Sequence, residues 1–278
     1  MEMQQLKENT WIYDTRSNLL LASILIHRVE EDSVVLIDTG CGPCDELFEE
    51  LDRRGWRVRA AICTHLHWDH TFNNEEVHRR HGVILASLRE SFPYISGAPH
   101  HGEYVTVTGG NIVTIAGKDF RLIPTSGHTP GHVSVVTPDN ICHMGDAVMS
   151  PPQLAIAKLP FMEETRTAIE SLDLLRNSSC DLYVAAHSGV ITPEELPGVL
   201  DLNLQKEHDI YDALVEYIDR PMDITELSVG FIKSLGITRS HVVDNPAWHR
   251  TVKQRLFELL RMNRIARDGY LITPVKKD

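Results

Sequence analysis

The sequence lacks three features that would each have assigned it to a particular class of protein. No apolar run approaches the roughly 18 residues of a membrane-spanning helix, and residues 1–10, MEMQQLKENT, lack the basic-then-apolar order of a signal peptide. The five cysteines are odd in number and sparse, unlike the dense, even sets of disulfide-stabilised secreted proteins. We therefore expect a cytoplasmic protein without structural disulfides and without a membrane partner.

Positive charge is also scarce, because 27 Lys and Arg face 39 Asp and Glu, for a net charge of −12. The deficit is uneven. Residues 233–278 contain ten Lys and Arg against four Asp and Glu, a local charge of +6, which leaves −18 for residues 1–232. The acidic residues 1–232, here called the acidic body, are a poor nonspecific partner for nucleic acid, whereas the basic C-terminal region could contact phosphates.

Apolar and β-branched runs alternate with helical patterns through the first two thirds of the chain. We predict strands at 19–29, 33–40, 58–65 and 181–187, helices at 44–55, 74–81 and 163–177, and a hairpin that turns at 138–140. Many predicted strands follow one another directly. This order favours an α/β (α+β) fold with two mixed sheets flanked by helices over a doubly wound parallel sheet.

The C-terminal region has a different pattern. Helical spacing runs from Glu194 to about Arg220 and ends at Pro221. Two further helices and a basic hairpin that turns at Asp268–Gly269 follow, an order typical of a helix-turn-helix with a wing. We predict a catalytic domain at 1–220 and a winged-helix-like module at 221–278.

Metal-ligating residue types are concentrated in THLHWDH, residues 64–70. His65, His67, Asp69 and His70 come directly after a predicted strand, where the chain enters a loop and all four can converge. Imidazole and carboxylate are ligands that Zn²⁺ accepts, so we favour a metal site here over a polar turn whose histidines are merely solvated. Three other predicted strands end near candidate ligands: His128 and His132, His143 and Asp146, and His187.

With these residues the sequence resembles the metallo-β-lactamase-fold hydrolase superfamily over about residues 10–195. The family pattern is an Asp in Asp-x-Gly, then His-x-His-x-Asp-His, then a distant His, Asp and His. The resemblance implies an αββα sandwich with two divalent metal ions at one edge of the sheets. Zn²⁺ is the expected ion, and Fe and Mn are the alternatives. It implies these ligands: His65, His67 and His128 for the first metal, Asp69, His70 and His187 for the second, and Asp146 as a bridge.

Two divalent ions about 3.5–4 Å apart can share and acidify a hydroxide, which supplies a nucleophile without Ser or Cys. Asp69 is predicted to act in catalysis by orienting this hydroxide or passing its proton to the leaving group. Asp38 matches a family position that orients the ligands, and its alternative role is to cap the next helix. We therefore predict hydrolysis of an ester, lactone, thioester or amide-type carbonyl bond in a small molecule.

The C-terminal module is similar to the tail of the β-lactamase-like-protein-2 group, some of whose members resemble single-stranded RNA endonucleases. A metal-dependent ribonuclease is therefore an alternative, and a DNA-binding regulator that senses a ligand through its metal site is another. We prefer a module that packs over the pocket or forms a homodimer, because the acidic body would repel a polyanion.

Three further features are candidates for the pocket or for redox chemistry. Trp68 and Phe72 are predicted to form an apolar wall for the substrate or to pack in the core. The segment 150–161 is a candidate pocket loop, in which Lys158 could neutralise an acidic substrate. Cys41 and Cys44, in Cys-Gly-Pro-Cys, have thioredoxin-like spacing, but we interpret them as an incidental pair in the turn before a helix.

Overall fold

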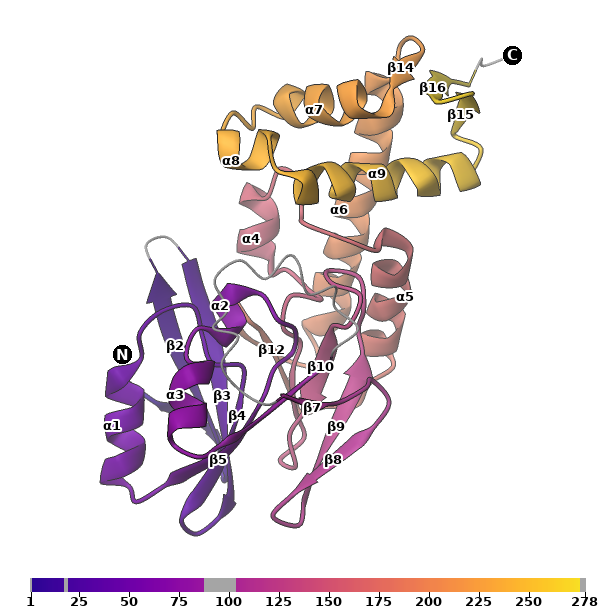
Figure 1. Cartoon of the computed structure of the whole chain (residues 1–278). Helices are drawn as coiled ribbons and strands as arrows, with labels where there is room; N and C mark the ends of the chain where they lie inside the picture. The colour runs from indigo at the N-terminus through magenta and orange to yellow at the C-terminus, as the bar shows by residue number, and fades with distance from the viewer. Residues whose placement is uncertain (1, 18–19, 88–103, 276–278) are drawn as a thin grey trace.

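Two β-sheets packed face to face form the centre of the computed structural model, which describes residues 2–17, 20–87 and 104–275 (Figure 1). Within these residues, the first sheet has the spatial order β1 (Gln4–Lys7), β2 (Thr10–Ser17), β3 (Leu20–Glu30), β4 (Ser33–Ile37), β5 (Arg57–Ile62), β6 (Val83–Ala86) and β7 (Tyr104–Thr106). The second has the order β13 (Gly189–Ile191), β12 (Leu182–Ala185), β11 (Ile141–His143), β10 (Val133–Val136), β9 (Lys118–Pro124) and β8 (Ile112–Ile115). Both sheets are mixed, since β4–β7 are parallel in the first and only β11 and β12 are parallel in the second.

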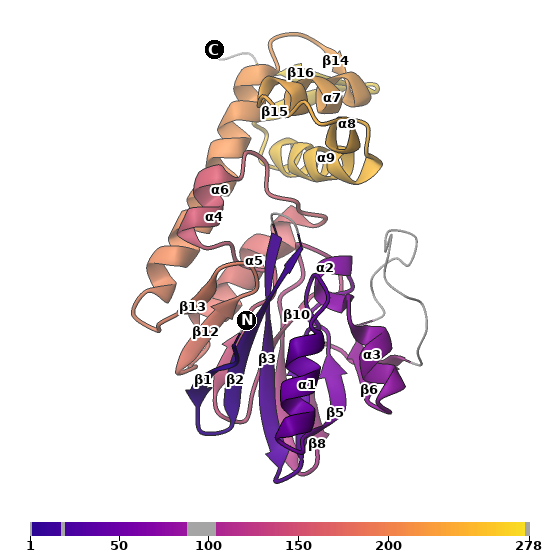
Figure 2. The ribbon, with the colours of Figure 1, turned by 90° about the vertical axis from the view of Figure 1, so that its left-hand side faces the viewer.

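Helices cover the outer faces of both sheets. α1 (Asp45–Arg53) and α3 (Asn74–Arg79) pack on the first sheet, and α5 (Thr165–Arg176) and α6 (Leu196–Tyr217) pack on the second (Figures 1 and 2). On α1, Leu47 and Leu51 lie one turn apart and are fully buried, each worth roughly 1.5–3 kcal/mol. The predicted αββα sandwich of two mixed sheets is confirmed.

The strands that lead to the site end earlier than their apolar runs predict. β4 ends at Ile37 and not at Gly40, because Asp38 has a left-handed φ of +59°, which takes the chain out of the sheet. β5 ends at Ile62, so His65 lies in a loop. The predicted hairpin between β10 and β11 is present, with Asn140 at a φ of +61°. Two N-terminal strands, β1 and β2, extend the sheet beyond the prediction.

The helix α6 connects the sandwich to the C-terminal region, as Figures 1 and 2 show. Its first half contributes Val199 and Leu200 to the core against the second sheet, and its second half contributes Ile210 and Leu214 to a separate core. The remaining elements of that core are α7 (Ile224–Ser234), α8 (Ser240–Val243), α9 (Pro246–Arg261) and a small sheet in the order β14 (Met222–Asp223), β16 (Leu271–Pro274) and β15 (Ile265–Asp268). The predicted hairpin is therefore present, while a winged-helix-like module and a domain boundary at 220 stay predictions.

Two short helices lie between the sandwich and the C-terminal helices: α2 (Trp68–Thr71) and α4 (Pro151–Ile156) (Figure 1). At the start of α4, the Ser150 amide donates to Gln153 Oε1 (3.0 Å). α4 occupies part of the segment 150–161 that the sequence indicates as a loop. None of the helices in the described ranges is both long and apolar enough to cross a membrane.

Candidate metal centre

Parallel strands bring the candidate ligands to one edge of the sandwich. β4 and β5 are parallel neighbours in the first sheet, and β11 and β12 are parallel neighbours in the second. The loops after these four strands carry, in order, Asp38, the cluster that begins at His65, Asp146 and His187. Because the carboxyl ends of parallel strands lie at the same edge, residues far apart in sequence meet there.

The first group consists of His65, His67 and His128, whose ligand nitrogens all lie within 4.8 Å of one another. His67 Nδ1 and His128 Nε2 are 2.9 Å apart. His128 Nδ1 donates to the carbonyl of Phe161 (3.2 Å), and this bond turns Nε2 toward the other two rings. The three rings thus present nitrogen lone pairs to a common point.

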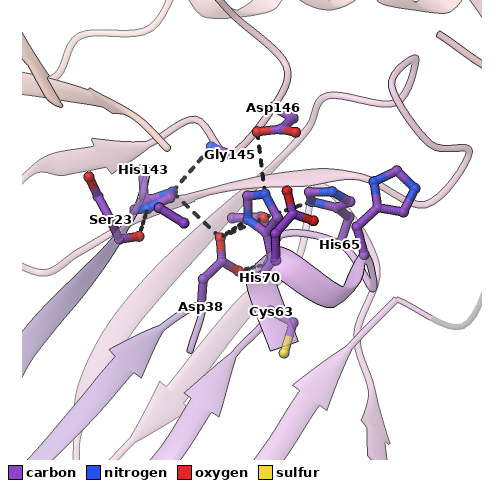
Figure 3. Close-up of polar contacts among 12 residues, drawn as sticks. Ser23, Asp38, Cys63, His65, His70, His143, Gly145 and Asp146 are labelled. Carbon is purple, nitrogen blue, oxygen red and sulfur yellow. Dashed lines mark hydrogen bonds and ion pairs between the residues drawn. The ribbon is translucent and has the colours of Figure 1, made fainter. Parts of the chain in front are cut away.

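The second group consists of Asp69, His70, Asp146 and His187, again with ligand atoms within 4.8 Å. Asp146 Oδ1 lies 3.4 Å from His70 Nε2, shown in Figure 3, and 3.1 Å from His187 Nε2. His187 Nδ1 donates to the carbonyl of Leu21, which directs Nε2 inward. Asp146 Oδ2 also lies 3.4 Å from His128 Nε2, so this carboxylate stands between the two groups, where the resemblance puts the bridging ligand.

The donor set fits divalent cations. Within the two ligand groups, three buried side-chain atoms have no hydrogen-bond partner: His65 Nε2, His70 Nε2 and Asp146 Oδ1. An unpartnered buried polar atom costs roughly 1–3 kcal/mol, and all three of these atoms face the ligand groups. A cation in each group would satisfy them, and five imidazoles with two carboxylates match zinc-type ligand chemistry.

The surroundings of His65, His128 and Asp146 favour the protonation states that bind a cation, whereas those of His70 favour the protonated ring. Burial lowers the pKa of His65 and of His128 well below the usual value, which keeps both rings neutral. Burial raises the pKa of Asp146, but His187, His70 and His128 outweigh it and hold the pKa well below the usual value. Burial lowers the pKa of His70, but Asp146 and Asp38 outweigh it and raise this pKa, so cation binding would displace a proton there.

Asp38 orients one ligand of each group (Figure 3). It accepts from His70 Nδ1 (2.7 Å), from the Thr64 amide (2.7 Å) and from Thr64 Oγ1 (2.9 Å). Because Thr64 Oγ1 donates to Asp38, it accepts from His65 Nδ1 at 3.1 Å. Burial raises the pKa of Asp38, but His70 and then His143 lower it below the usual range, so the carboxylate stays charged. Both imidazoles are therefore held with Nε2 toward the site.

The alternative role of Asp38 as a helix cap is wrong, since α1 has no side-chain cap and begins at Asp45.

Asp38→Asn is expected to weaken cation binding about 10- to 100-fold, because the neutral amide stabilises the His70 orientation less well. Competition between the protein and a chromogenic chelator for Zn²⁺ measures this affinity. Asp52→Asn is the matched control, since Asp52 is exposed and pairs with Arg80 on the surface. Equal Zn²⁺ affinity in both variants would show that Asp38 does not orient the ligands.

His132 and His143 lie beside the ligands, and their rings accept hydrogen bonds from backbone amides. The Asp146 amide donates to His132 Nε2 (3.1 Å), and the Gly145 amide donates to His143 Nδ1 (3.1 Å). Burial lowers the pKa of His132 to about 3, so the ring is a neutral acceptor. Gly145 has a φ of +53°, and a Cβ there would lie 2.5 Å from His132 Nε2 and 2.7 Å from Thr64 Oγ1. These contacts position the Asp146 carboxylate.

A pocket opens from the ligands toward α4, α5 and α6 and contains about 680 Å³ of empty space, part of it open to solvent. His128, Asp146 and His187 of the ligand groups line it, together with the apolar side chains of Val148, Met149, Leu154, Phe161, Ile169 and Leu172. Segment 150–161 thus contributes to the pocket as predicted. Trp68 and Phe72 are 39% and 42% exposed and lie outside the pocket lining, so the core alternative is wrong and substrate contact stays a prediction.

Helix α9 forms hydrogen bonds with the pocket wall at residues 160–162, a contact that the sequence does not predict. Thr251 Oγ1 donates to the Met162 carbonyl (3.0 Å) and accepts from the Met162 amide (3.2 Å). Arg255 Nη2 donates to the Pro160 carbonyl (3.2 Å). Phe161 lies between Pro160 and Met162 in the chain. Its ring centroid is 5.4 Å from that of His128 and 5.5 Å from that of Trp248. Helix α9 therefore packs against the segment that forms this wall of the pocket.

The Cys-Gly-Pro-Cys stretch forms the turn between β4 and α1. Cys41 and Cys44 are free and buried, as are the other three cysteines. Burial raises the pKa of the Cys44 thiol to about 12, the opposite of the low pKa that dithiol exchange needs. Gly40, with a φ of +79°, leaves no room for a Cβ, which would lie 2.4 Å from Thr15 Oγ1. The interpretation as a turn is confirmed.

Comparisons with known proteins agree with this geometry. The chain is 28% identical over 127 residues to a hydroxyacylglutathione hydrolase of Maricaulis maris (45% of this chain, 47% of that one). It is 25% identical over 193 residues to an atrochrysone carboxyl ACP thioesterase of Aspergillus chevalieri (66% and 57%). The chain spans about half the length of the curated relatives it matches.

Among solved structures, a metallo-beta-lactamase family protein from Thermus thermophilus superimposes with a TM-score of 0.73 at 19% identity (98% of this chain, 100% of that one). A beta-lactamase domain protein from Burkholderia ambifaria gives 0.71 at 15% identity (99% and 94%). This coverage extends the likeness of fold to the C-terminal helices. Residues 22–187 match the metallo-beta-lactamase superfamily. The chain belongs to the metallo-beta-lactamase superfamily.

Proposed function

We propose that the protein is a dinuclear metal-dependent hydrolase that cleaves an ester, lactone, thioester or amide-type carbonyl bond in a small molecule. The observation that carries this proposal is the pair of adjoining ligand groups, with unpartnered donor atoms, at the end of an apolar pocket. The names of two relatives, a hydroxyacylglutathione hydrolase and an ACP thioesterase, favour an acyl thioester among these substrates.

Two bound divalent ions would polarise the carbonyl group and acidify a water molecule. We expect Zn²⁺, with Fe or Mn as alternatives. His65, His67 and His128 would hold one ion, Asp69, His70 and His187 the other, and Asp146 both. Asp69, whose Oδ2 lies 3.6 Å from His187 Nε2, would also take the proton of the attacking water and return it to the leaving group. The Phe161 side of the pocket would exclude bulk water from the reacting carbonyl.

The charge of the C-terminal region argues against the ribonuclease and DNA-binding alternatives. Four arginines in 233–278 form ion pairs with carboxylates: Arg250 with Glu163, Arg255 with Glu207, Arg261 with Glu258, and Arg264 with Asp212. Much of the local positive charge is therefore neutralised within the protein and is not offered to phosphates. A homodimer through this region stays a prediction that light scattering would test.

A metal-defined activity panel tests the proposed function. The protein is stripped with a chelator, reloaded separately with Zn²⁺, Fe²⁺ or Mn²⁺, and assayed on a lactone, a thioester, a β-lactam, a phosphodiester and single-stranded RNA. We expect turnover of a carbonyl substrate that disappears in the stripped protein and returns on reloading. Cleavage confined to RNA would favour the ribonuclease, and absence of both metal binding and turnover would overturn the proposal.

A further inference from the structure

The pocket contains one positive side chain that the proposed chemistry leaves unused. Among the described residues that line it, Lys206 on α6 is the single Lys or Arg, and the acids are Asp146 and Glu207. Asp146 belongs to the ligand groups, and Glu207 is bound by both Nε (2.6 Å) and Nη2 (2.7 Å) of Arg255. The charge of Glu207 is therefore compensated from outside the pocket, and the charge of Lys206 is not.

Lys206 is partly buried, and in the described part of the chain no carboxylate or carbonyl oxygen forms an ion pair or hydrogen bond with it. Its helix is fixed against the pocket wall, since Asn203, one turn earlier, donates to the Met149 carbonyl (2.8 Å) and accepts from the Met149 amide (3.0 Å). An ammonium group among apolar walls interacts strongly with an anion, because little water screens it there.

Lys158, the cation suggested by the sequence, does not occupy this position. Its Nζ donates to the Gly236 carbonyl (3.2 Å) on the exposed side of the segment, and it does not line the pocket. The same pocket is also lined by Val148, Leu154, Phe161 and Ile169, which suit an alkyl or acyl chain. The pocket thus combines residues of both ligand groups, apolar walls and one ammonium group.

We propose that Lys206 determines specificity by binding an anionic group, a carboxylate or a phosphate, of an acyl substrate whose apolar chain fills the pocket. The scissile carbonyl of that substrate lies at His128, Asp146 and His187. This inference rests on the proposed hydrolase function and narrows it to amphiphilic acyl esters or thioesters with a charged end. No covalent role is assigned to Lys206.

Three series of phenyl thioesters with chains of four to ten carbons test the inference. They end in a carboxylate, a phosphate or a methyl group. In the Zn²⁺-loaded protein, Lys206→Met is expected to raise KM for the anionic series about five- to tenfold, with KM for the methyl series within about twofold of wild type. Lys206→Arg keeps the charge and is expected to retain the preference. Lys158→Met is the matched control and is expected to match wild type. The series that loses more affinity identifies the carboxylate or the phosphate as the better group.

A binding measurement separates this inference from the proposed function. Monomethyl esters of the corresponding dicarboxylic acids are titrated calorimetrically into metal-free wild type and Lys206→Met, with methyl alkanoates of equal length as neutral probes. Binding of the charged esters that depends on Lys206 supports the inference even if no thioester is hydrolysed, in which case only the hydrolase fails. Equal effects of Lys206→Met on charged and neutral probes, or no effect on either, overturn the inference while hydrolysis stands.

Discussion

Asp146→Asn is expected to lower turnover by about 10³-fold or more and to leave less than two equivalents of metal on the protein. The Asp146 carboxylate lies within 3.4 Å of His70 Nε2, His128 Nε2 and His187 Nε2, so it contacts both ligand groups. The neutral amide no longer offsets the charge of two cations held close together, and their electrostatic contribution is worth several kcal/mol. Turnover of the substrate identified in the panel and metal analysis by mass spectrometry give the two readouts.

Asp201→Asn is the matched control for Asp146→Asn. Asp201 is also an aspartate with a positive partner, Arg176, but it lies on the surface with a side chain 67% exposed. Wild-type turnover and metal content are expected in this variant. An Asp146→Asn protein that keeps both metals and more than a tenth of the wild-type rate would show that the carboxylate is not shared between two cations.

Arg255→Met is expected to destabilise the protein by about 3–5 kcal/mol, the cost of leaving one charge of a buried pair without its partner. Arg255 is fully buried and holds Glu207 through two nitrogens, while also donating to the carbonyls of Thr251 and Pro160. Its loss would leave the Glu207 carboxylate uncompensated beside the pocket. Urea unfolding followed by circular dichroism measures the change.

Two further variants distinguish charge from packing in this effect. Arg255→Met with Glu207→Met removes both charges and is expected to recover much of the lost stability, since well-packed apolar side chains replace buried pairs at little cost. Arg264→Met breaks the surface pair with Asp212 and is expected to cost about 1 kcal/mol or less. If Arg255→Met costs no more than Arg264→Met, or the double variant is no more stable than the single one, the buried charge is not the cause.

Part of the site is predictable because its residues are adjacent in sequence or follow parallel strands. His65, His67, Asp69 and His70 lie within six residues, so few backbone arrangements can keep them apart. Asp146 and His187 follow the parallel strands β11 and β12. In the sequence, an apolar run that ends in His or Asp indicates a candidate ligand at the end of a strand. The family pattern supplied the correspondence between these distant residues.

Other parts depend on tertiary contacts that have no local sequence signal. Lys206 lies in a helix whose pattern indicates only which residues are apolar, and its position in the pocket depends on how α6 crosses α4 and α5. The contacts of Thr251 and Arg255 with the segment at 160–162 join residues about 90 positions apart. Trp68, the first residue of α2, is 39% exposed, which no local pattern indicates, and its contact with the substrate stays a prediction. β4 ends early at Ile37 because Asp38 turns out of the sheet, and the contacts of Asp38 with Thr64 and His70 likewise have no local sequence signal.

The helix α6 also limits how the chain can be divided. Its second half contributes Ile210, Tyr211 and Leu214 to the C-terminal core, and Glu207 is bound by Arg255 from α9. A fragment that ends near residue 220 would carry an unpaired buried carboxylate and a bare apolar helix face into solvent, and would lose the contacts that hold Pro160 and Met162. The superfamily match at 22–187 ends before α9, so we expect a fragment limited to the matched residues to be less stable than the whole chain.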